Sequence, residues 1–448
     1  MVAIAFVSYA ILAWLRPRLA LGVILFAIPF GHLEKFSIAG IPFTFPEFAT
    51  YVLAGVIAVG RMRAKRPTPS RSPSQWEGEK KIVSPPPTGR GGVGGWGLRL
   101  RLRDPWIILP LLWILAAAIA AIGSPAGVRA WGIWKAYVVA PVMMFFVIRA
   151  LLRGAEASSN KNHESRIMNQ GDDRNSIIHH SSFIILPLAA GAVIVAAIAI
   201  AQRWWPIGVP YPWSAPGKFR ATSVFGYPNA VGLFLGPIVV LSFGAAMRLF
   251  QWRQQHGAGI KNQESGITGT ASISLFMMHN SLFFILTSAI AVVAIVFARS
   301  TGALVALVVA PFVFVGCMWF TTHTFRPHYP IFHDRRKWDS RRNGWAMRGA
   351  SRWAAVVIAG WVAASLVLTA WLPYRGEQPT WGSPIVQKLT FQKWSGSVRL
   401  SQYRETWQLL RDHPIRGAGL AGYQTAIRPY HEKKDVEIFL YPHNLLLA

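Results

Sequence analysis

The stretch at residues 104–123, DPWIILPLLWILAAAIAAIG, decides the class of fold. Beyond its first residues it is apolar throughout, and its length is that of a helix crossing about 30 Å of hydrocarbon. A second run, SFIILPLAAGAVIVAAIAIA at 182–201, has the same character. Because a chain in lipid must satisfy its backbone polar groups internally, such runs span a membrane as helices. We therefore predict an all-α polytopic membrane protein, in preference to a soluble protein with buried helices.

Apolar runs of this kind recur along the whole chain, in which 52% of the residues are hydrophobic and 14% are charged. We predict about ten visible transmembrane helices, which form a bundle over residues 1–372. The predicted spans lie at about 2–15, 19–31, 46–60, 105–123, 131–152, 182–201, 224–247, 281–298, 300–320 and 353–372. The N-terminus lacks the basic start and the small-residue cleavage site of a secretory signal peptide.

A net charge of +28 is compatible with nucleic-acid binding, but the positions of the basic residues argue against it. Alternate loops hold 29 of the 46 Lys and Arg residues. These loops lie at 16–18, 61–104, 149–181, 248–280 and 321–352. Excess Lys and Arg in short loops marks the cytoplasmic side of a membrane. The charge therefore indicates topology rather than a nucleic-acid partner.

The intervening segments then face outward. They include residues 202–223, Arg299 and a long tail from 373. We predict a multi-pass protein of the plasma (inner) membrane, in contact with membrane lipids, whose active site lies on the extracytoplasmic side. The first two spans are short, so the side on which the N-terminus lies stays open.

Three cytoplasmic loops have no expected role in the chemistry. Residues 61–104 contain a Pro-, Gly- and Ser-rich stretch that is typical of disorder. The loops at 153–181 and 250–280 share a pattern, KNHESRI and KNQESGI, and the similarity stops just inside the following helices. We interpret both loops as inserted sequence. Their histidines are poor metal ligands, and the single cysteine excludes a cysteine-cluster site, so we predict neither a metal nor a cofactor.

The segment at 373–442 is the only long outward one, and we predict a large extracytoplasmic catalytic loop that forms a lid of short helices. Within it, SVRLSQYRETWQLLRDHPIRGAG predicts an amphipathic helix that is ended by His413 and Pro414. The loop is rich in arginine and carries no pair of acidic or histidine residues at metal-ligand spacing.

One face of this predicted helix carries an apolar stripe. Tyr403, Trp407 and Leu410 lie at i, i+4 and i+7, and Arg399 precedes them by one turn on the same stripe. Either an anion meets this guanidinium, or the arginine extends past the apolar face to headgroups or water. Arg404 lies on a different face, where solvent is the simpler environment.

Two further arginines lie in outward segments. Arg220 precedes a predicted helix whose start is interrupted by Pro228 and Asn229. The free N–H groups of a broken helix favour an anion, although Asn229 alone can also cap a helix. Arg299 lies in a tight turn between two spans, either as an interface anchor or as a ligand.

The pair His443 and Asn444 opens an apolar run at the end of the outward tail. A histidine titrates near neutrality, so His443 can accept a proton from a hydroxyl, or it can serve only as an interfacial aromatic beside Asn444. Arginines bind phosphate and diphosphate bidentately and stay charged. An enzyme with a lipid diphosphate donor can therefore expel its leaving group against arginines without a divalent ion.

Together these segments resemble the O-antigen ligase and polymerase superfamily, integral-membrane glycosyltransferases that act on undecaprenyl-diphosphate glycans. VRLSQYRETWQLLRDHPIRGAGLAGYQ at 398–424, followed by HNLLL at 443–447, is similar to the family's Arg-Leu pair, helix, His-Pro-x-x-Gly-x-Gly and later His-Asn-x-x-Leu. FRATSVFGYPNAVGLFL at 219–235 resembles the family's arginine-containing segment before a Pro-Asn helix start. STGALVAL at 300–307 resembles its small-residue helix.

The resemblance implies roles for individual residues. The histidine of the family's His-Asn acts as base on the acceptor hydroxyl, which corresponds to His443. The arginine before the tail helix binds the donor diphosphate, which corresponds to Arg399. The family's second arginine directly follows the serine of the small-residue motif. Here Thr301 holds that place, and Arg299 stands before Ser300 instead.

We therefore hypothesise a metal-independent, inverting glycosyltransferase of the O-antigen ligase or polymerase type, acting in the biosynthesis of lipopolysaccharide or another cell-surface polysaccharide. It would move a glycan from undecaprenyl diphosphate to an acceptor hydroxyl on the outer face of the plasma membrane, with His443 as catalytic base. The candidate substrate-binding residues are Arg399, Arg220, Arg299, Arg404, Asn444 and Tyr403. Family members continue into further spans after His-Asn, so the resemblance also implies that residues 443–448 begin a truncated transmembrane helix.

Two alternatives stay open. The acceptor can be a glycan, a lipid or a protein, so a protein O-oligosaccharyltransferase of the same superfamily fits the same fold, although we favour a ligase or polymerase. A transporter of lipid-linked sugars or anions would also use outward arginines. Such a transporter normally shows charged or broken segments at the membrane midplane in both halves of the chain, and this sequence shows almost none.

Overall fold

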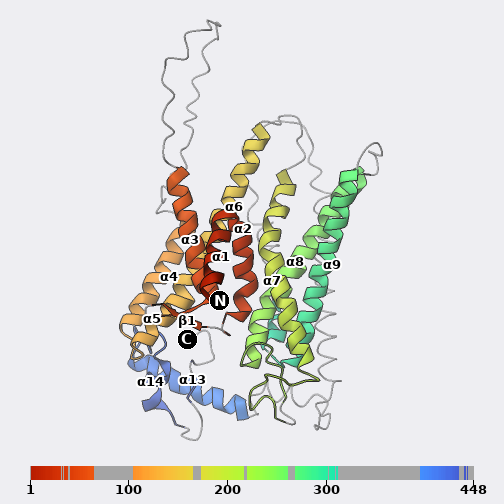
Figure 1. The fold of residues 1–448 in the computed structure, drawn as a ribbon. Coiled ribbons are helices and arrows are strands. Elements are labelled where there is room, and N and C mark those ends of the chain that lie inside the picture. The colour runs from red at the N-terminus through yellow and green to blue at the C-terminus, as the bar shows by residue number, and fades with distance from the viewer. Residues whose placement is uncertain are drawn as a thin grey trace, which may run out of the picture.

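The computed structural model describes most of the membrane region and much of the tail, and it is mostly helical (Figure 1). The described residues are 2–31, 33, 35–38, 41–64, 104–164, 173–215, 219–260, 268–300, 302–307, 309–310, 394–432, 438–439 and 441.

Helices α1 to α9 stand side by side as an upright bundle in Figure 1. Their bounds are α1 Val2–Leu15, α2 Pro17–Ala27, η1 Ile28–Phe30, α3 Phe45–Ala64, α4 Pro105–Ile122, α5 Val128–Trp134, the π-helix η3 Lys135–Val139, α6 Ala140–Glu164, α7 Asp173–Ala201, α8 Pro228–Ile260 and α9 Thr268–Phe297. Within the described part of the chain, 5 helical stretches are long and apolar enough to cross a membrane. They are Pro105–Ile122, Val128–Arg153, Phe183–Ala201, Pro228–Ala246 and Asn280–Phe297.

The prediction of a helical multi-pass membrane protein is confirmed, because five of the predicted spans, from 105–123 to 281–298, coincide with these stretches, whereas the spans predicted at 2–15, 19–31 and 46–60 fall on shorter apolar helices. The span predicted at 300–320 is described only at 302–307 and 309–310, where it is helical. The span predicted at 353–372 and the loop at 65–103 lie outside the described residues. The count of ten therefore stays a prediction.

Helices also extend into the two segments that the sequence predicted as inserted loops. α6 continues to Glu164 and α7 begins at Asp173, while α8 continues to Ile260 and α9 begins at Thr268. A helix that continues past the end of an apolar span keeps its backbone hydrogen bonds, so hydropathy alone does not mark its end.

A short β-hairpin that the sequence analysis did not predict precedes α3. Strand β1 (Lys35–Ile38) pairs antiparallel with β2 (Ile41–Thr44). A two-stranded hairpin is marginally stable by itself. Here Lys135 of the π-helix fastens it, because its Nζ lies 3.6 Å from the centroid of the Phe43 ring and 3.1 Å from Glu47 Oε1.

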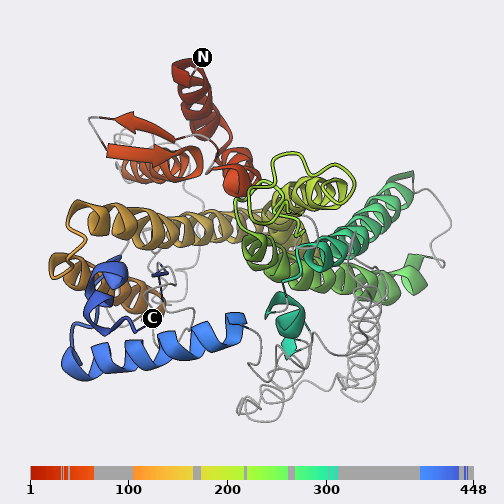
Figure 2. The same cartoon turned by 90° about the horizontal axis from the view of Figure 1, so that it is seen from below.

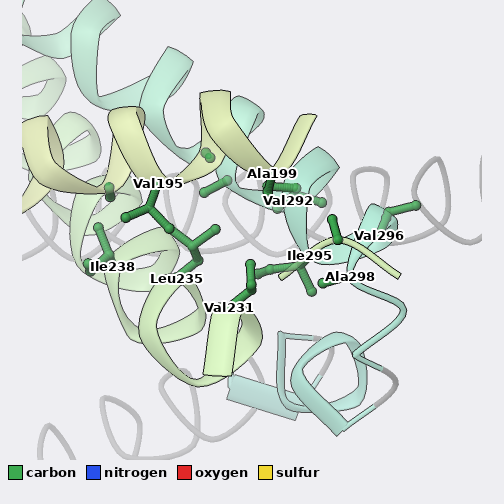
Figure 3. Packing of buried hydrophobic residues seen from close by; sticks show 14 of the residues in the cluster. Val195, Ala199, Val231, Leu235, Ile238, Val292, Ile295, Val296 and Ala298 are labelled. Atoms are coloured by element: carbon green, nitrogen blue, oxygen red, sulfur yellow. The ribbon is translucent and has the colours of Figure 1, made fainter. Parts of the chain in front are cut away.

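A buried cluster rich in alanine and β-branched residues lies between α7, α8 and α9 (Figure 3). Helices in lipid gain little from the hydrophobic effect, so close packing of small residues holds them together. Gly232 of α8 marks one such approach. A Cβ at this position would lie 2.6 Å from Ala303 Cβ and 2.7 Å from Ser300 Cβ. This packing fixes the turn that follows α9, and with it Arg299, against α8.

The tail helix α13 (Trp394–Asp412) lies across one end of the bundle (Figures 1 and 2), and α14 (Tyr423–Ala426) and η4 (Arg428–Tyr430) follow it. The described residues of the connection between α7 and α8, 202–215 and 219–227, lie at the same end in Figure 1. We call this the α13 end of the bundle. The predicted outward segments therefore share one end, while the side of the membrane that this end faces stays a prediction.

Candidate functional site

Arg220 and its neighbour Ala221 cap the C-terminal end of α9. The last carbonyls of a helix have no partner within the helix. Here the Ala221 N–H donates to the Phe297 carbonyl over 3.1 Å. Arg220 donates from Nε to the Ala298 carbonyl (3.0 Å) and from Nη2 to the Arg299 carbonyl (3.1 Å). Three successive carbonyls are therefore bound, and the cation lies at the negative end of the helix dipole.

Arg220 is half-buried among neutral partners. Its Nη2 also donates to Asn229 Oδ1 (2.9 Å), and its guanidinium carbon lies 5.0 Å from the centroid of the Trp213 ring. Within the described residues Arg220 pairs with no carboxylate, and its Nη1 donates no hydrogen bond. Burial lowers the pKa of Arg220, Tyr227 partly opposes this, and the nearby Arg399 lowers the pKa further.

These properties fit the binding of an anion. A cation that is removed from water without a counter-ion is destabilised, and a second cation nearby adds to the cost. A bound diphosphate would offset both the loss of hydration and the repulsion between cations, because guanidinium groups bind its oxygens bidentately. The structure therefore places Arg220 against the backbone of a second predicted arginine, Arg299, while the charge of a third, Arg399, affects the pKa of Arg220.

Arg299 stands in the left-handed region of backbone space, with φ = 49°. For a residue other than glycine this conformation costs roughly 1–2 kcal/mol. Its N–H donates to the Val296 carbonyl (2.9 Å), and its own carbonyl accepts from Arg220, so hydrogen bonds on both sides hold the strained turn. Strain of this kind persists only where the surrounding structure fixes it.

Gln202, directly after α7, frames the loop that carries Arg220. Its Oε1 accepts from the N–H groups of Thr222 (3.1 Å) and Ser223 (2.7 Å). Its Nε2 donates to the carbonyls of Ile207 (3.2 Å) and Ser223 (3.1 Å). The sequence analysis missed this residue. The available signal was a lone glutamine at the end of an otherwise apolar run.

The predicted interruption of a helix by Pro228 and Asn229 is wrong, because α8 begins at Pro228. Proline suits the first position of a helix, where its missing N–H would have no partner in any case. The preceding residues 223–227 form turns and bends. The Asn229 side chain binds Arg220 through Oδ1 and donates to the Tyr227 hydroxyl (3.4 Å) through Nδ2.

The predicted packing face of α13 is also wrong within the described residues. Arg399 is exposed, Tyr403 is half-buried, and Trp407 is 58% exposed. The structure buries the adjacent face instead, formed by Val398, Gln402, Glu405, Thr406 and Leu409. Most of these residues are polar, so an analysis of apolar periodicity cannot find the face that they form.

The buried polar residues of α13 are bound by residues that follow the helix. The bonds join Thr406 Oγ1 to Tyr423 OH (2.7 Å), Glu405 Oε2 to His431 Nδ1 (3.1 Å) and Gln402 Nε2 to the Tyr441 carbonyl (3.0 Å). Buried polar side chains with such partners specify one arrangement of a loop. The tail is therefore folded onto α13 through these polar side chains as well as through the buried apolar cluster of Leu409, Tyr423 and Ile427.

The glycine turn after α13 docks onto the turn between α4 and α5. The Leu420 N–H donates to the Ala120 carbonyl (3.0 Å), and Ser124 Oγ donates to the Leu420 carbonyl (2.6 Å). Gly419 makes this approach possible, with φ = 71°. A Cβ there would lie 2.8 Å from Ser124 Cα.

The substitution Gly419→Ala is expected to release the tail from the α4–α5 turn. The added methyl group would meet backbone that cannot move aside, beyond the strain of roughly 1–2 kcal/mol for alanine at positive φ. Limited proteolysis of the purified protein measures the effect, with faster cleavage expected between residues 412 and 422.

Gly417→Ala is the matched control, because Gly417 also has positive φ (53°) but the nearest atom to its Cβ would lie 3.7 Å away. The Gly417→Ala variant has the backbone strain of alanine at positive φ but no steric clash of the added methyl group. It is therefore expected to be cleaved more slowly than Gly419→Ala. Equal cleavage of the two variants would show that the contact with Ser124 does not hold the tail.

The remaining predicted site residues are Arg404, His443 and Asn444. Arg404 is exposed on α13. His443 and Asn444 lie outside the described residues, and the carbonyl bound by Gln402 belongs to Tyr441, two residues before His443. Among the described residues, no group of three or more His, Cys, Asp and Glu side chains could hold a metal ion.

Comparison with protein families gives a match in the C-terminal part of the chain. Residues 286–448 match a family model described as O-Antigen ligase. Comparisons with curated proteins and with solved structures found no match. The matched region includes most of the membrane-spanning part of α9, Arg299 and the whole of α13, whereas Arg220 precedes it.

Proposed function

Because residues 286–448 place the chain in the O-antigen ligase superfamily, we propose that it transfers a glycan from undecaprenyl diphosphate to an acceptor hydroxyl on the outer face of the plasma membrane. The acceptor is a glycan, a lipid or a protein. The proposed reaction inverts the anomeric carbon and uses no metal ion.

One observation supports this proposal most directly: among the described residues the half-buried Arg220 has no carboxylate partner, and burial and the positive charge of Arg399 both lower its pKa. Repulsion between two cations is tolerated where both bind a common anion. A diphosphate carries enough charge and oxygens for two or more guanidinium groups. The Arg299 carbonyl accepts a hydrogen bond from Arg220, so the backbone of this predicted arginine lies beside the Arg220 guanidinium.

In the proposed reaction, the acceptor oxygen attacks the anomeric carbon of the donor sugar. The bond between that carbon and the diphosphate oxygen breaks with its electron pair, and the leaving group departs as undecaprenyl diphosphate. His443 takes the acceptor proton. Arg399, Arg220 and Arg299 stabilise the charge that develops on the leaving oxygen.

The tether of Tyr441 to α13 supports the assignment of His443. Gln402 binds the Tyr441 carbonyl and lies one turn from Arg399 on the same helix. Two residues of extended chain span at most about 7 Å. The last described residue before His443, Tyr441, is therefore bound to α13 one turn from Arg399.

The test of the proposed function is a transfer assay with the full chain in membranes, using a lipid-diphosphate-linked glycan in the presence of EDTA. Arg399→Lys is expected to lower transfer about 10- to 100-fold, because lysine keeps the charge and loses the bidentate fork, worth about 1.5–3 kcal/mol. Transfer by the unaltered chain is expected to persist in EDTA.

Arg411→Lys provides the control, since Arg411 is an exposed arginine on α13 and should tolerate the exchange. Unchanged transfer by Arg399→Lys would remove the bidentate diphosphate contact from the proposal. Loss of transfer in EDTA, with recovery on adding a divalent ion, would overturn the metal-independent reaction. Movement of the intact lipid-linked glycan across the membrane, without transfer, would favour a transporter.

A further inference from the structure

The connection between α7 and α8 binds the end of α9 through a side chain and through the main chain. The Ala221 N–H donates to the Phe297 carbonyl. The Arg220 guanidinium donates to the next two carbonyls, those of Ala298 and Arg299, and all three distances are 3.0–3.1 Å. Two of the three guanidinium nitrogens are therefore already used by protein carbonyls. Among the described residues, Nη1 of Arg220 donates no hydrogen bond, so this nitrogen can bind a ligand.

The turn at Arg299, which Arg220 binds, has a strained backbone that needs stabilising contacts. Arg299 has φ = 49°, and the following Ser300 N–H reaches the Ile295 carbonyl only over 3.4 Å. Below it, Ser300 and Ala303 press against Gly232 of α8. The direction in which the Arg299 side chain leaves the backbone depends on this turn, because a left-handed residue directs its Cβ differently from a helical one.

Arg220 is itself fixed in place. Its N–H donates to the Trp213 carbonyl (3.0 Å), its guanidinium lies over the Trp213 ring, and Asn229 Oδ1 accepts from Nη2. The Gln202 bonds hold the backbone just after it. Such a set of contacts holds the guanidinium in one orientation, as a positioning residue requires.

We propose that Arg220 acts chiefly as a positioning residue, which clamps the end of α9 so that Arg299 is presented to the donor diphosphate. This inference rests on the proposed function only for the identity of the anion. Direct contact of Arg220 with the diphosphate is then limited to its Nη1 edge. The two arginines form one functional unit, with Arg299 as the contact and Arg220 as its support.

The first measurement tests the clamp without any activity. Amide hydrogen exchange of residues 296–303 is followed by mass spectrometry on the purified full chain, comparing the parent protein with Arg220→Lys and Arg411→Lys. Lysine keeps the charge but cannot bind two adjacent carbonyls with a planar fork, so exchange in this segment is expected to be about tenfold faster or more. Arg411→Lys is expected to match the parent. Unchanged exchange in Arg220→Lys would overturn the proposal.

The second measurement is a double-mutant cycle on transfer, with Arg220→Lys, Arg299→Ala and the double variant. If Arg220 works through Arg299, the double variant falls within about twofold of Arg299→Ala alone. If the two losses multiply, Arg220 contacts the donor independently and the proposal is wrong. The pair Arg220→Lys and Arg399→Ala serves as comparison, and its losses are expected to multiply.

The two measurements separate this proposal from the proposed function. The proposed function is contradicted if the chain shows no transfer, or if Arg399→Ala leaves transfer unchanged. The hydrogen-exchange result then still reports whether Arg220 holds the end of α9. Rapid exchange in Arg220→Lys, combined with multiplied losses, contradicts the positioning role and leaves the glycosyltransferase intact.

Discussion

Replacing His443 by alanine is expected to lower glycan transfer about 10²- to 10⁴-fold, the contribution of a positioned general base. The acceptor hydroxyl is a poor nucleophile while it keeps its proton, and the arginines at the α13 end assist only the leaving group. Binding of the donor is expected to persist, because the diphosphate contacts do not involve the histidine. The loss should therefore appear in kcat rather than in KM for the donor.

Two variants sharpen this measurement. His443→Gln keeps a polar side chain of similar reach but takes no proton at neutral pH, so it is expected to be as inactive as His443→Ala. His179→Ala, near the start of α7 and at the opposite end of that helix from Gln202, is the matched control and is expected to transfer normally. A His443→Gln variant with parental activity would show that the histidine only anchors the chain.

The substitution Gln202→Leu is expected to destabilise the protein more than any other change in the loop before α8. It leaves the N–H groups of Thr222 and Ser223 without the Oε1 acceptor, in a place where Gln202 is only 3% exposed. Each unsatisfied buried group costs about 1–3 kcal/mol. For a protein of this size the loss of two such groups corresponds to a fall in apparent Tm of about 2–6 °C.

Fluorescence-detected unfolding in detergent measures this fall, and the transfer assay is expected to follow it, because the loop carries Arg220. Gln202→Glu offers an intermediate case, since it keeps both acceptor contacts of Oε1 and loses the donations from Nε2. A stable Gln202→Leu protein would show that the loop is held by its apolar contacts alone. Reduced transfer without reduced stability would assign Gln202 a direct effect on Arg220.

The helices of the membrane region were predictable because each of them carries its own signal. A run such as 104–123 is apolar at every depth, and its length has one physical interpretation in a membrane. The grouping of Arg220, Arg299 and the tail at one end was also predictable, since it follows from alternation of basic loops. Neither inference depends on how side chains meet.

Features that depend on side-chain partners were missed or misjudged. The buried face of α13 is polar, and its residues find partners that lie up to 39 positions away, as between Gln402 and Tyr441. The hairpin at β1 and β2 depends on a lysine from the π-helix. Periodicity along one segment holds no information about partners of this kind, so Gln402 could not be recognised beforehand, and Gln202 was marked only as a lone glutamine after an apolar run.

The contact between the tail and the α4–α5 turn has a consequence for how the sequence can change during evolution. The hydrogen bonds at Leu420 use its backbone N–H and carbonyl, so its side chain is free to drift without loosening the contact. Gly419 and Ser124 have no such freedom, because one must lack a Cβ and the other supplies the donor. Among descendants of this protein, the positions 124 and 419 are therefore expected to change together or not at all, inside a turn that otherwise diverges.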